Sequence, residues 1–240
     1  MTVTARFQFT GWAEPDADLP AVQRDILRSS GLELGWDDPW FEADLRLYRL
    51  VGAAEQGYER VADAAADALR AAGGIAVGAE LTPPDPLDDG PFHVEFSARG
   101  TDIAIHQLRI ASLTLKIPDA DLAPPSGSTT TATLDIACWI DPDRSPEPAL
   151  ERLRHALDLP HIAWQDGTEP MRGTATLHHA DVPAAMLASL IAIGGVSRYA
   201  NLHPPRPTGP DRWRLGYSSG AEFTLLPGVR MLEIWSDLTR

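Results

Sequence analysis

The same succession of short patterns occurs twice in this chain of 240 residues. A Trp-x-acid-Pro-Asp pattern starts at Trp12 and recurs at Trp139, about 127 residues later. Further matches follow in one order: a triplet ending in tryptophan (34–36 and 162–164), Gly-Gly after an alanine-rich run (73–74 and 194–195), Gly-Pro (90–91 and 209–210) and Asp-Leu (121–122 and 237–238). Each match is weak alone, but their common order indicates an internal repeat, which decides the fold before any other signal.

The repeat predicts two homologous units, residues 1–122 and 131–240. Residues 123–130 between them are rich in proline, serine, glycine and threonine. Such a segment spaces two domains but does not pack a core. We therefore expect the boundary between the units to lie there.

Both units show the same predicted order of elements. Phe7 and Phe9 alternate with polar residues, as in a half-buried strand, and Leu134 and Ile136 do so in the second unit. The predicted strands are 5–13, 32–36, 45–51, 75–81, 92–97 and 103–117, then 134–140, 162–164, 174–178, 198–202, 212–217 and 222–235. The predicted helices start near Pro20, cover 55–72, start near Ser145 and cover 183–193, and Gly73 is expected to end the second of them.

This order is typical of a split βαβ, ferredoxin-like sandwich, in which helices cover one face of an antiparallel sheet. We expect an α+β fold: a tandem repeat of two ferredoxin-like units (βαββαβ plus a C-terminal hairpin) that forms an internal pseudo-dimer. The helix predicted at 183–193 has no charge, whereas its counterpart carries Glu59, Asp63 and Asp67. A helix that is apolar all round must be covered, by the other unit, by a loop of its own unit, by a second chain or by a ligand.

The composition limits the partners and the compartment. The net charge is −14 and the pI is near 4.8, which argues against nucleic acid and anionic membranes as partners. The single cysteine, Cys138, fits a reducing compartment, and residues 1–10 do not resemble a signal peptide, so we expect a cytoplasmic protein and allow a homo-oligomer. The apolar run 182–197 is too short to cross a bilayer.

No motif in the sequence specifies a reaction. Glu14, Asp16, Asp141 and Asp143 are typical of turns that lead into helices, and no nucleophile elbow, phosphate loop or dinucleotide fingerprint is present. The adjacent His178 and His179 point to opposite faces of a predicted strand and do not readily chelate one ion. We therefore predict no metal and no cofactor.

The preferred hypothesis is a non-catalytic binding protein. It would engage a protein partner, or a small apolar ligand between its halves, through Trp36, Trp40, Trp164, Met186 and Leu190. The alternative is a cofactor-free enzyme, a cyclase, isomerase or hydrolase, with a pocket in the second unit. Its pocket wall would contain His178, Tyr199 or Asp166. A third hypothesis is a structural subunit of a larger assembly.

Overall fold

The computed structural model describes residues 2–87, 90–123, 126–159, 161–165 and 169–240 and shows a mixed α+β protein with one large antiparallel sheet. Residues 1–122 form β1 (Val3–Ala13), α1 (Leu19–Ser30), β2 (Gly35–Trp36), β3 (Trp40–Glu42), β4 (Leu47–Tyr58), α2 (Val61–Ile75), β5 (Ala79–Thr82), β6 (Phe92–Arg99), the 3-10 helix η1 (Gly100–Asp102) and β7 (Leu108–Ile117). The rest forms β8 (Thr130–Ile140), α3 (Glu147–Ala156), β9 (Ala163–Gln165), β10 (Met171–His179), α4 (Val182–Val196), β11 (Ala200–Gly209), β12 (Arg212–Gly220) and β13 (Val229–Thr239).

We call residues 1–122 the first half and residues 130–240 the second half, because the strands of the two follow one plan. The sheet order is β2-β4-β1-β7-β6-β5-β11-β12-β13-β8-β10-β9, and β3 pairs with β4. Read inward from each edge, β4-β1-β7-β6-β5 therefore corresponds to β10-β8-β13-β12-β11. The two halves meet where β5 pairs with β11.

The neighbour of β1 differs from the one that a ferredoxin-like order predicts. In that order the strand after the second helix pairs with the first strand. Here β7 pairs with β1, and β6 and β7 lie between β1 and β5. The second half shows the same arrangement, because β13 pairs with β8 whereas the 10-residue β11 does not.

The boundary between β4 and α2 also differs from the predicted one. Glu55 and Tyr58 were expected in a helix, but they extend β4 and pair with Arg6 and Val3 of β1. Pairing with a long neighbouring strand overrides the helical preference of this segment. Gly73 does not end the helix, because α2 continues to Ile75.

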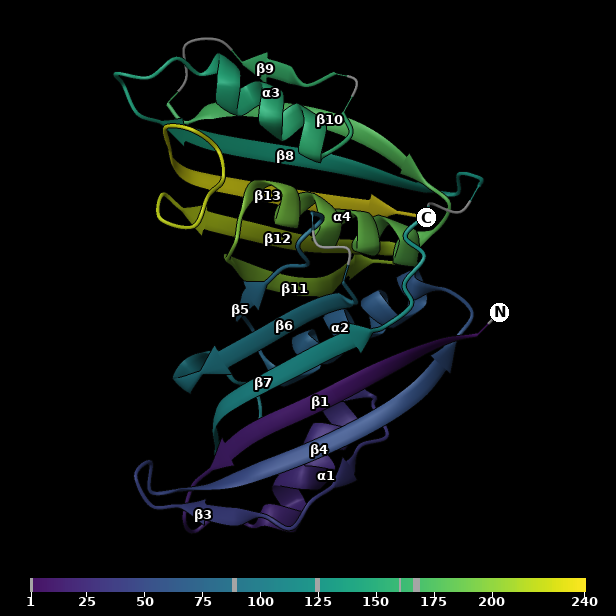
Figure 1. Cartoon of the computed structure of the whole chain (residues 1–240), viewed down its shortest axis with the longest axis vertical. Coiled ribbons are helices and arrows are strands. Elements are labelled where there is room, and N and C mark those ends of the chain that lie inside the picture. Colours follow the sequence, from purple (N-terminus) through teal and green to yellow (C-terminus); the bar gives the residue numbers. More distant parts are fainter. Residues whose placement is uncertain (1, 88–89, 124–125, 160, 166–168) are drawn as a thin grey trace.

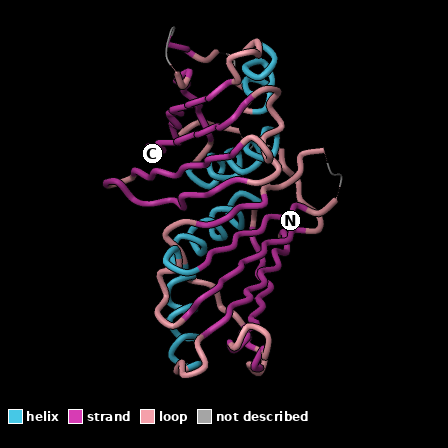
Figure 2. Tube along the Cα trace, turned by 90° about the vertical axis from the view of Figure 1, so that its left-hand side faces the viewer, coloured by secondary structure: helices cyan, strands magenta, loops and turns pink. Residues whose placement is uncertain are grey.

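The helices follow one another along the long axis of the molecule in the order α3, α4, α2, α1 (Figure 2). In Figure 1, α3 and α4 lie in front of the upper part of the sheet, and α1 and α2 lie behind the lower part, because the sheet twists between them. The neighbours α3 and α4, α4 and α2, and α2 and α1 are in contact.

The contacts at the junction of the halves are reciprocal. Ala79 pairs with Leu202, and Leu81 pairs with Ala200. Ala79 and Ala200 are counterparts, as are Leu81 and Leu202, because each pair differs in residue number by as much as Gly73 and Gly194 do. Contacts that repeat under one shift are what a twofold relation between halves produces.

The helix that carries no charge is covered from both halves. It is α4, which contacts α2 of the first half and α3, β8, β10 and β13 of the second. Pro84 of the first half crosses α4 at Gly194, where only a glycine fits. A Cβ on Gly194 would lie 2.0 Å from the Pro84 carbonyl oxygen. Asp181 caps the start of α4 by accepting a 2.9 Å hydrogen bond from the Ala184 amide, and it pairs with Arg60 at 2.6 Å.

Candidate functional site: a cavity in the second half

A cavity of about 470 Å³ lies between the sheet of the second half and the helices α3 and α4. Volumes of roughly 300–1,000 Å³ are usual for small-molecule sites. Its lining comes from six elements and the loops beside them: Leu122, Ala132, Leu134, Ala156, Leu157, Asp158, Leu177, His178, His179, Ala188, Ser189, Ile191, Ala192, Ile193, Tyr217, Ile234 and Ser236. The lining is mainly aliphatic, with a few polar groups among the apolar ones.

The strands place alternate residues on the cavity side, because successive side chains of a strand point to opposite faces. Leu134 of β8 is opposite Ser236 of β13, and Tyr217 of β12 is opposite Ile234. Tyr217 and Ser236 are therefore diagonal neighbours on one face of the sheet, with Cα atoms about 7–8 Å apart. Both residues line the floor of the cavity, although their hydroxyl oxygens have almost no accessible surface.

The hydroxyl groups of Tyr217 and Ser236 are both buried, and neither has a hydrogen-bond partner among the described residues. The two residues are 3% and 1% exposed. The hydroxyl of Thr130, a residue at the start of β8 that is as deeply buried as Ser236, is in the same situation. A buried hydroxyl without a partner costs roughly 1–3 kcal/mol, so these groups are unusual unless something binds them.

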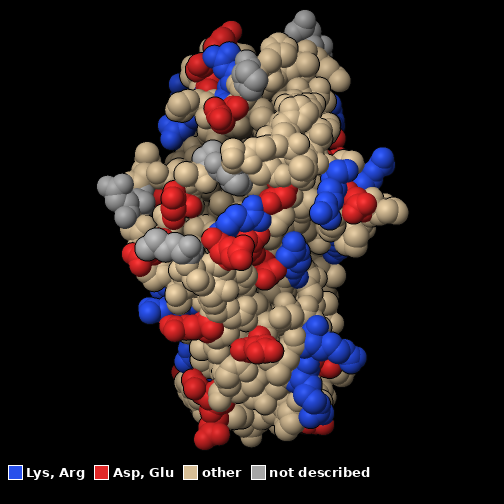
Figure 3. Space-filling view, turned by 90° about the vertical axis from the view of Figure 1, so that its right-hand side faces the viewer, with Lys and Arg blue, Asp and Glu red and all other residues tan. Residues whose placement is uncertain are grey.

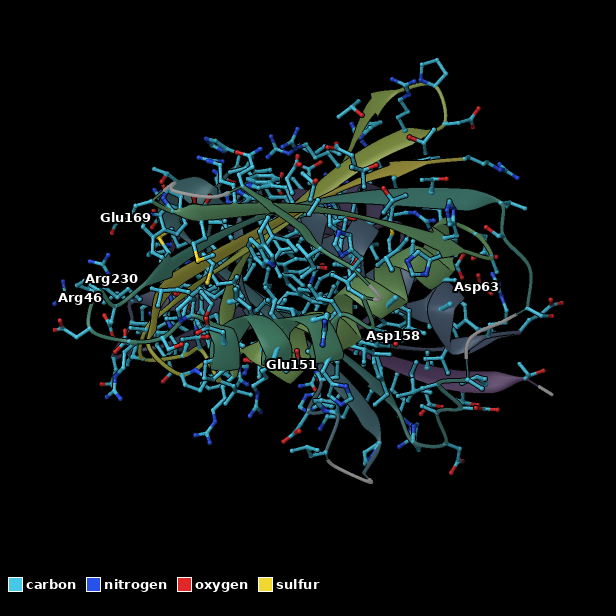
Figure 4. All side chains as sticks on the ribbon, turned by 90° about the horizontal axis from the view of Figure 1, so that it is seen from above. Arg46, Asp63, Glu151, Asp158, Glu169 and Arg230 are labelled. Atoms are coloured by element: carbon cyan, nitrogen blue, oxygen red, sulfur yellow. The ribbon has the colours of Figure 1, made fainter. Side chains whose placement is uncertain are left out.

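The ionisable groups of the cavity favour a neutral interior. Burial raises the pKa of Tyr217, so its hydroxyl stays protonated. Burial, with a contribution from His178, lowers the pKa of His179, so its imidazole is neutral at pH 7. His178 is exposed at the rim, and Asp158, also exposed, follows α3. Figure 4 shows Asp158 far from Glu169 and Arg230, which pair at 2.6 Å at another edge of the molecule.

The corresponding part of the first half is filled. By strand pairing, Phe96 and Leu113 occupy the positions that Tyr217 and Ile234 occupy in the second half. The space beside Phe96 and Leu113 measures about 10 Å³, which is no more than one water needs. Two larger side chains also fill this part of the first half. Phe7 and Leu115, which pair with each other, take the positions of Leu134 and Ser236.

The rim of the cavity also differs between the halves. In the first half Tyr58 donates a 3.1 Å hydrogen bond to Asp67 of α2, and Asp67 pairs with Arg70 at 2.6 Å. Counted from the glycine pairs of the two helices, Asp67 and Arg70 correspond to Ala188 and Ile191. The counterpart of Tyr58 is His179. It pairs with Thr130 of β8 in the position where Tyr58 pairs with Val3 of β1. The polar closure of the first half is thus replaced by residues that line the cavity.

The structure brings one of the residues predicted for an enzymatic pocket to this cavity. His178 lies at its rim, 3.5 Å from the Thr131 hydroxyl. Tyr199 is not among the residues that line it and instead hydrogen-bonds Glu80 of the first half, which together with burial raises its pKa. Asp166 lies outside the described residues. Tyr217 and Ser236 were not predicted as site residues. Ser236 could have been noticed by aligning the two halves, because it stands where the first half has Leu115.

The residues predicted to bind a ligand or partner lie elsewhere. Met186 and Leu190 are fully buried, and neither is among the residues that line the cavity. Trp36 and Trp164 pack over glycines of the neighbouring strands, since a Cβ on Gly52 or Gly173 would lie 3.0 Å or 2.7 Å from them. Trp40 is 46% exposed and stacks on the Arg49 guanidinium, at 5.3 Å from the ring centre.

The geometry does not support a serine–histidine proton relay in the cavity. Ser236 and His179 are separated by β8, and the pairing registers offset them by four residues along the strands. Their Cα atoms are therefore roughly 16 Å apart, beyond the reach of a hydrogen bond between the side chains. Within the described residues, no three His, Cys, Asp or Glu side chains gather closely enough to hold a metal ion.

Comparison with protein-family models, with curated proteins and with solved structures found no match for this chain. The site must therefore be interpreted from its own geometry. In the described part of the chain, no helix has the length and apolar character required to span a membrane. Figure 3 shows acidic and basic side chains interspersed on one face, with no broad area of a single sign.

Proposed function

We propose that this is a non-catalytic binding protein that holds a small apolar ligand in the cavity of its second half. The observation that carries the proposal is a cavity of about 470 Å³ whose floor contains two buried hydroxyls that have no hydrogen-bond partner among the described residues. Most of its lining is aliphatic, and burying a ligand there removes apolar surface from water at roughly 25 cal/mol per Å². The enzymatic alternative has less support, because the titratable and nucleophilic groups of the cavity are not assembled.

In this proposal the chain is an acidic, cytoplasmic tandem repeat whose two homologous units form an internal pseudo-dimer. The common sheet order and the reciprocal pairing of β5 with β11 support this origin. One unit then keeps a filled core, and the other has lost core volume and gained a binding site. The ligand site lies within the second unit and reaches the junction of the halves at Leu122.

A neutral fluorescent probe, N-phenyl-1-naphthylamine, tests the proposal. We expect one molecule to bind per chain, with enhanced emission. Ser236→Leu and Leu134→Phe place the side chains of the first half in the cavity and should each weaken probe binding at least tenfold. Ser218→Leu, on the opposite face of β12, is the matched control and should bind as the natural protein does.

Circular dichroism and unfolding curves of each variant would show that a loss of binding is not a loss of fold. Probe binding that survives both cavity-filling substitutions would place the probe elsewhere and overturn the proposal. The absence of any saturable binding to the natural protein would do the same.

A further inference from the structure

The floor and walls of the cavity specify a class of ligand. We propose that the site takes an uncharged amphiphile, with one hydroxyl or carbonyl head on Tyr217 and Ser236 and an unbranched apolar tail along α4. This inference rests on the proposed function and narrows it. It is carried by the positions of the two hydroxyls, by the charges of the lining and by the continuation of the cavity beyond Leu122.

The head group is fixed by the two floor hydroxyls. Tyr217 and Ser236 are diagonal neighbours on one face of the sheet, so a head group that enters between their side chains comes near both hydroxyls. A hydroxyl can donate and accept, and a carbonyl oxygen can accept from both. A single oxygen-bearing head would satisfy both buried groups, whereas a pure hydrocarbon would leave them unpaired.

The charges of the lining argue against an ionic head. Among the described residues that line the cavity there is no lysine or arginine, and the carboxylate there is Asp158. A carboxylate or phosphate head would thus be buried without a cation, which costs several kcal/mol. A cationic head would have to leave the floor to reach Asp158, which is exposed at the rim.

The apolar tail of the proposed ligand is inferred from the cavity wall on α4 and from a second hollow beyond Leu122. Ala188, Ile191 and Ala192 of α4 face the cavity, and the volume holds roughly fifteen non-hydrogen atoms at ~30 Å³ each. Leu122 and Ile191 also line a second hollow of about 440 Å³, which Phe92 of the first half helps to form. A tail too long for the cavity can therefore continue past Leu122 into this hollow, whose lining also includes Asp85, His93 and Glu95.

Competition against the fluorescent probe at pH 8 tests the class. The competitors are 1-decanol, decanoic acid and decylamine, which share a chain length and differ in head charge. We expect 1-decanol to displace the probe at a concentration at least tenfold lower than either ion. Along 1-hexanol, 1-octanol and 1-decanol the affinity should rise about fourfold per methylene.

Two results separate this inference from the proposed function. If decanoic acid or decylamine competes as well as 1-decanol, or none of the three competes with bound probe, the ligand class is wrong while the binding site stands. If the probe itself does not bind, both proposals fail.

The double variant Tyr217→Phe, Ser236→Ala isolates the head group. It should lose about tenfold in affinity for 1-decanol, the worth of two hydrogen bonds, and a smaller factor in affinity for the probe, which carries no hydroxyl or carbonyl oxygen. Ser218→Ala, beside Tyr217 but on the opposite face, should change neither. An unchanged affinity of the double variant for 1-decanol would overturn the assignment of the floor hydroxyls.

Discussion

The first and second halves of this protein share a strand order but differ in what fills the space between sheet and helices. In the first half Phe7, Phe96 and Leu115 are buried and the space beside Phe96 measures about 10 Å³, whereas their counterparts Leu134, Tyr217 and Ser236 line a cavity of about 470 Å³. The backbone plan is kept while side chains change size and polarity. Two regions with the same strand order can thus differ in free volume through side-chain size alone.

The difference has an energetic side. Filled cores are close-packed, and each missing methylene costs about 1 kcal/mol. The second half forgoes this packing and also buries hydroxyls without partners among the described residues. A bound ligand would restore both contributions, so the second half should gain more stability from a ligand than the first.

The largest expected change in stability comes from replacing Leu115 of the first half by serine, the residue found at its counterpart Ser236. Leu115→Ser removes a fully buried side chain and adds a hydroxyl beside Phe7. We expect the free energy of unfolding in urea to fall by about 4 kcal/mol. A loss below about 1 kcal/mol would mean that the first-half core is not packed as described.

The junction of the halves provides the second test. A Cβ on Gly194 would lie 2.0 Å from the Pro84 carbonyl oxygen, whereas one on Gly73 would lie 3.1 Å from a Pro204 side-chain carbon. Gly194→Ala should therefore cost about 3 kcal/mol and Gly73→Ala less than about 1 kcal/mol. Equal losses for the two variants would show that the crossing at Gly194 is not tight.

The reverse exchange, Ser236→Leu, should stabilise the ligand-free protein. The added carbons fill part of the cavity and the unpaired hydroxyl is removed, which together are worth about 1–2 kcal/mol. Urea unfolding measured without ligand gives the change directly. Destabilisation by this variant would contradict the presence of free space beside Leu134.

Two tyrosines that are not counterparts of each other give smaller effects of opposite sign. The Tyr58 hydroxyl donates to Asp67, whereas that of Tyr217 has no partner among the described residues. Tyr58→Phe should lower the free energy of unfolding by about 1 kcal/mol, and Tyr217→Phe should leave it unchanged or raise it by about 1 kcal/mol. A clear loss of stability in Tyr217→Phe would indicate that its hydroxyl is already satisfied.

The smallest effect concerns pH. Burial lowers the pKa of His179 in the folded protein, so below about pH 6.5 the unfolded chain binds a proton that the folded one resists. The contribution of His179 is therefore complete above pH 6.5 and is lost as the pH falls. His179→Tyr, which installs the first-half residue, should reduce the loss of stability between pH 7 and pH 5 by less than about 1 kcal/mol. Identical pH profiles for the two proteins would remove His179 from the comparison.

The mixed α+β class and the positions of several elements were predictable from periodicity. The alternation of apolar and polar residues around Phe7 and Leu134 predicted β1 and β8. The uncharged run predicted α4, and it also predicted that other elements cover this helix. The pairing of Glu55 and Tyr58 with β1 was not predictable, because local residues favour a helix there and a distant strand decides otherwise. The cavity depends on the pairing of Ser236 with Leu134, which the sequence reveals only once the registers are known.

The central claim is that the second half, and not the first, takes up an apolar ligand between its sheet and α4. The most direct measurement is methyl NMR of the natural protein during titration with 1-decanol. We expect saturable shifts for the methyl groups of Ala132, Leu177 and Ile193, and none for those of Leu69, Val94 and Leu115 in the first half. Shifts that centre on the first half, or no saturable shift at all, would contradict it.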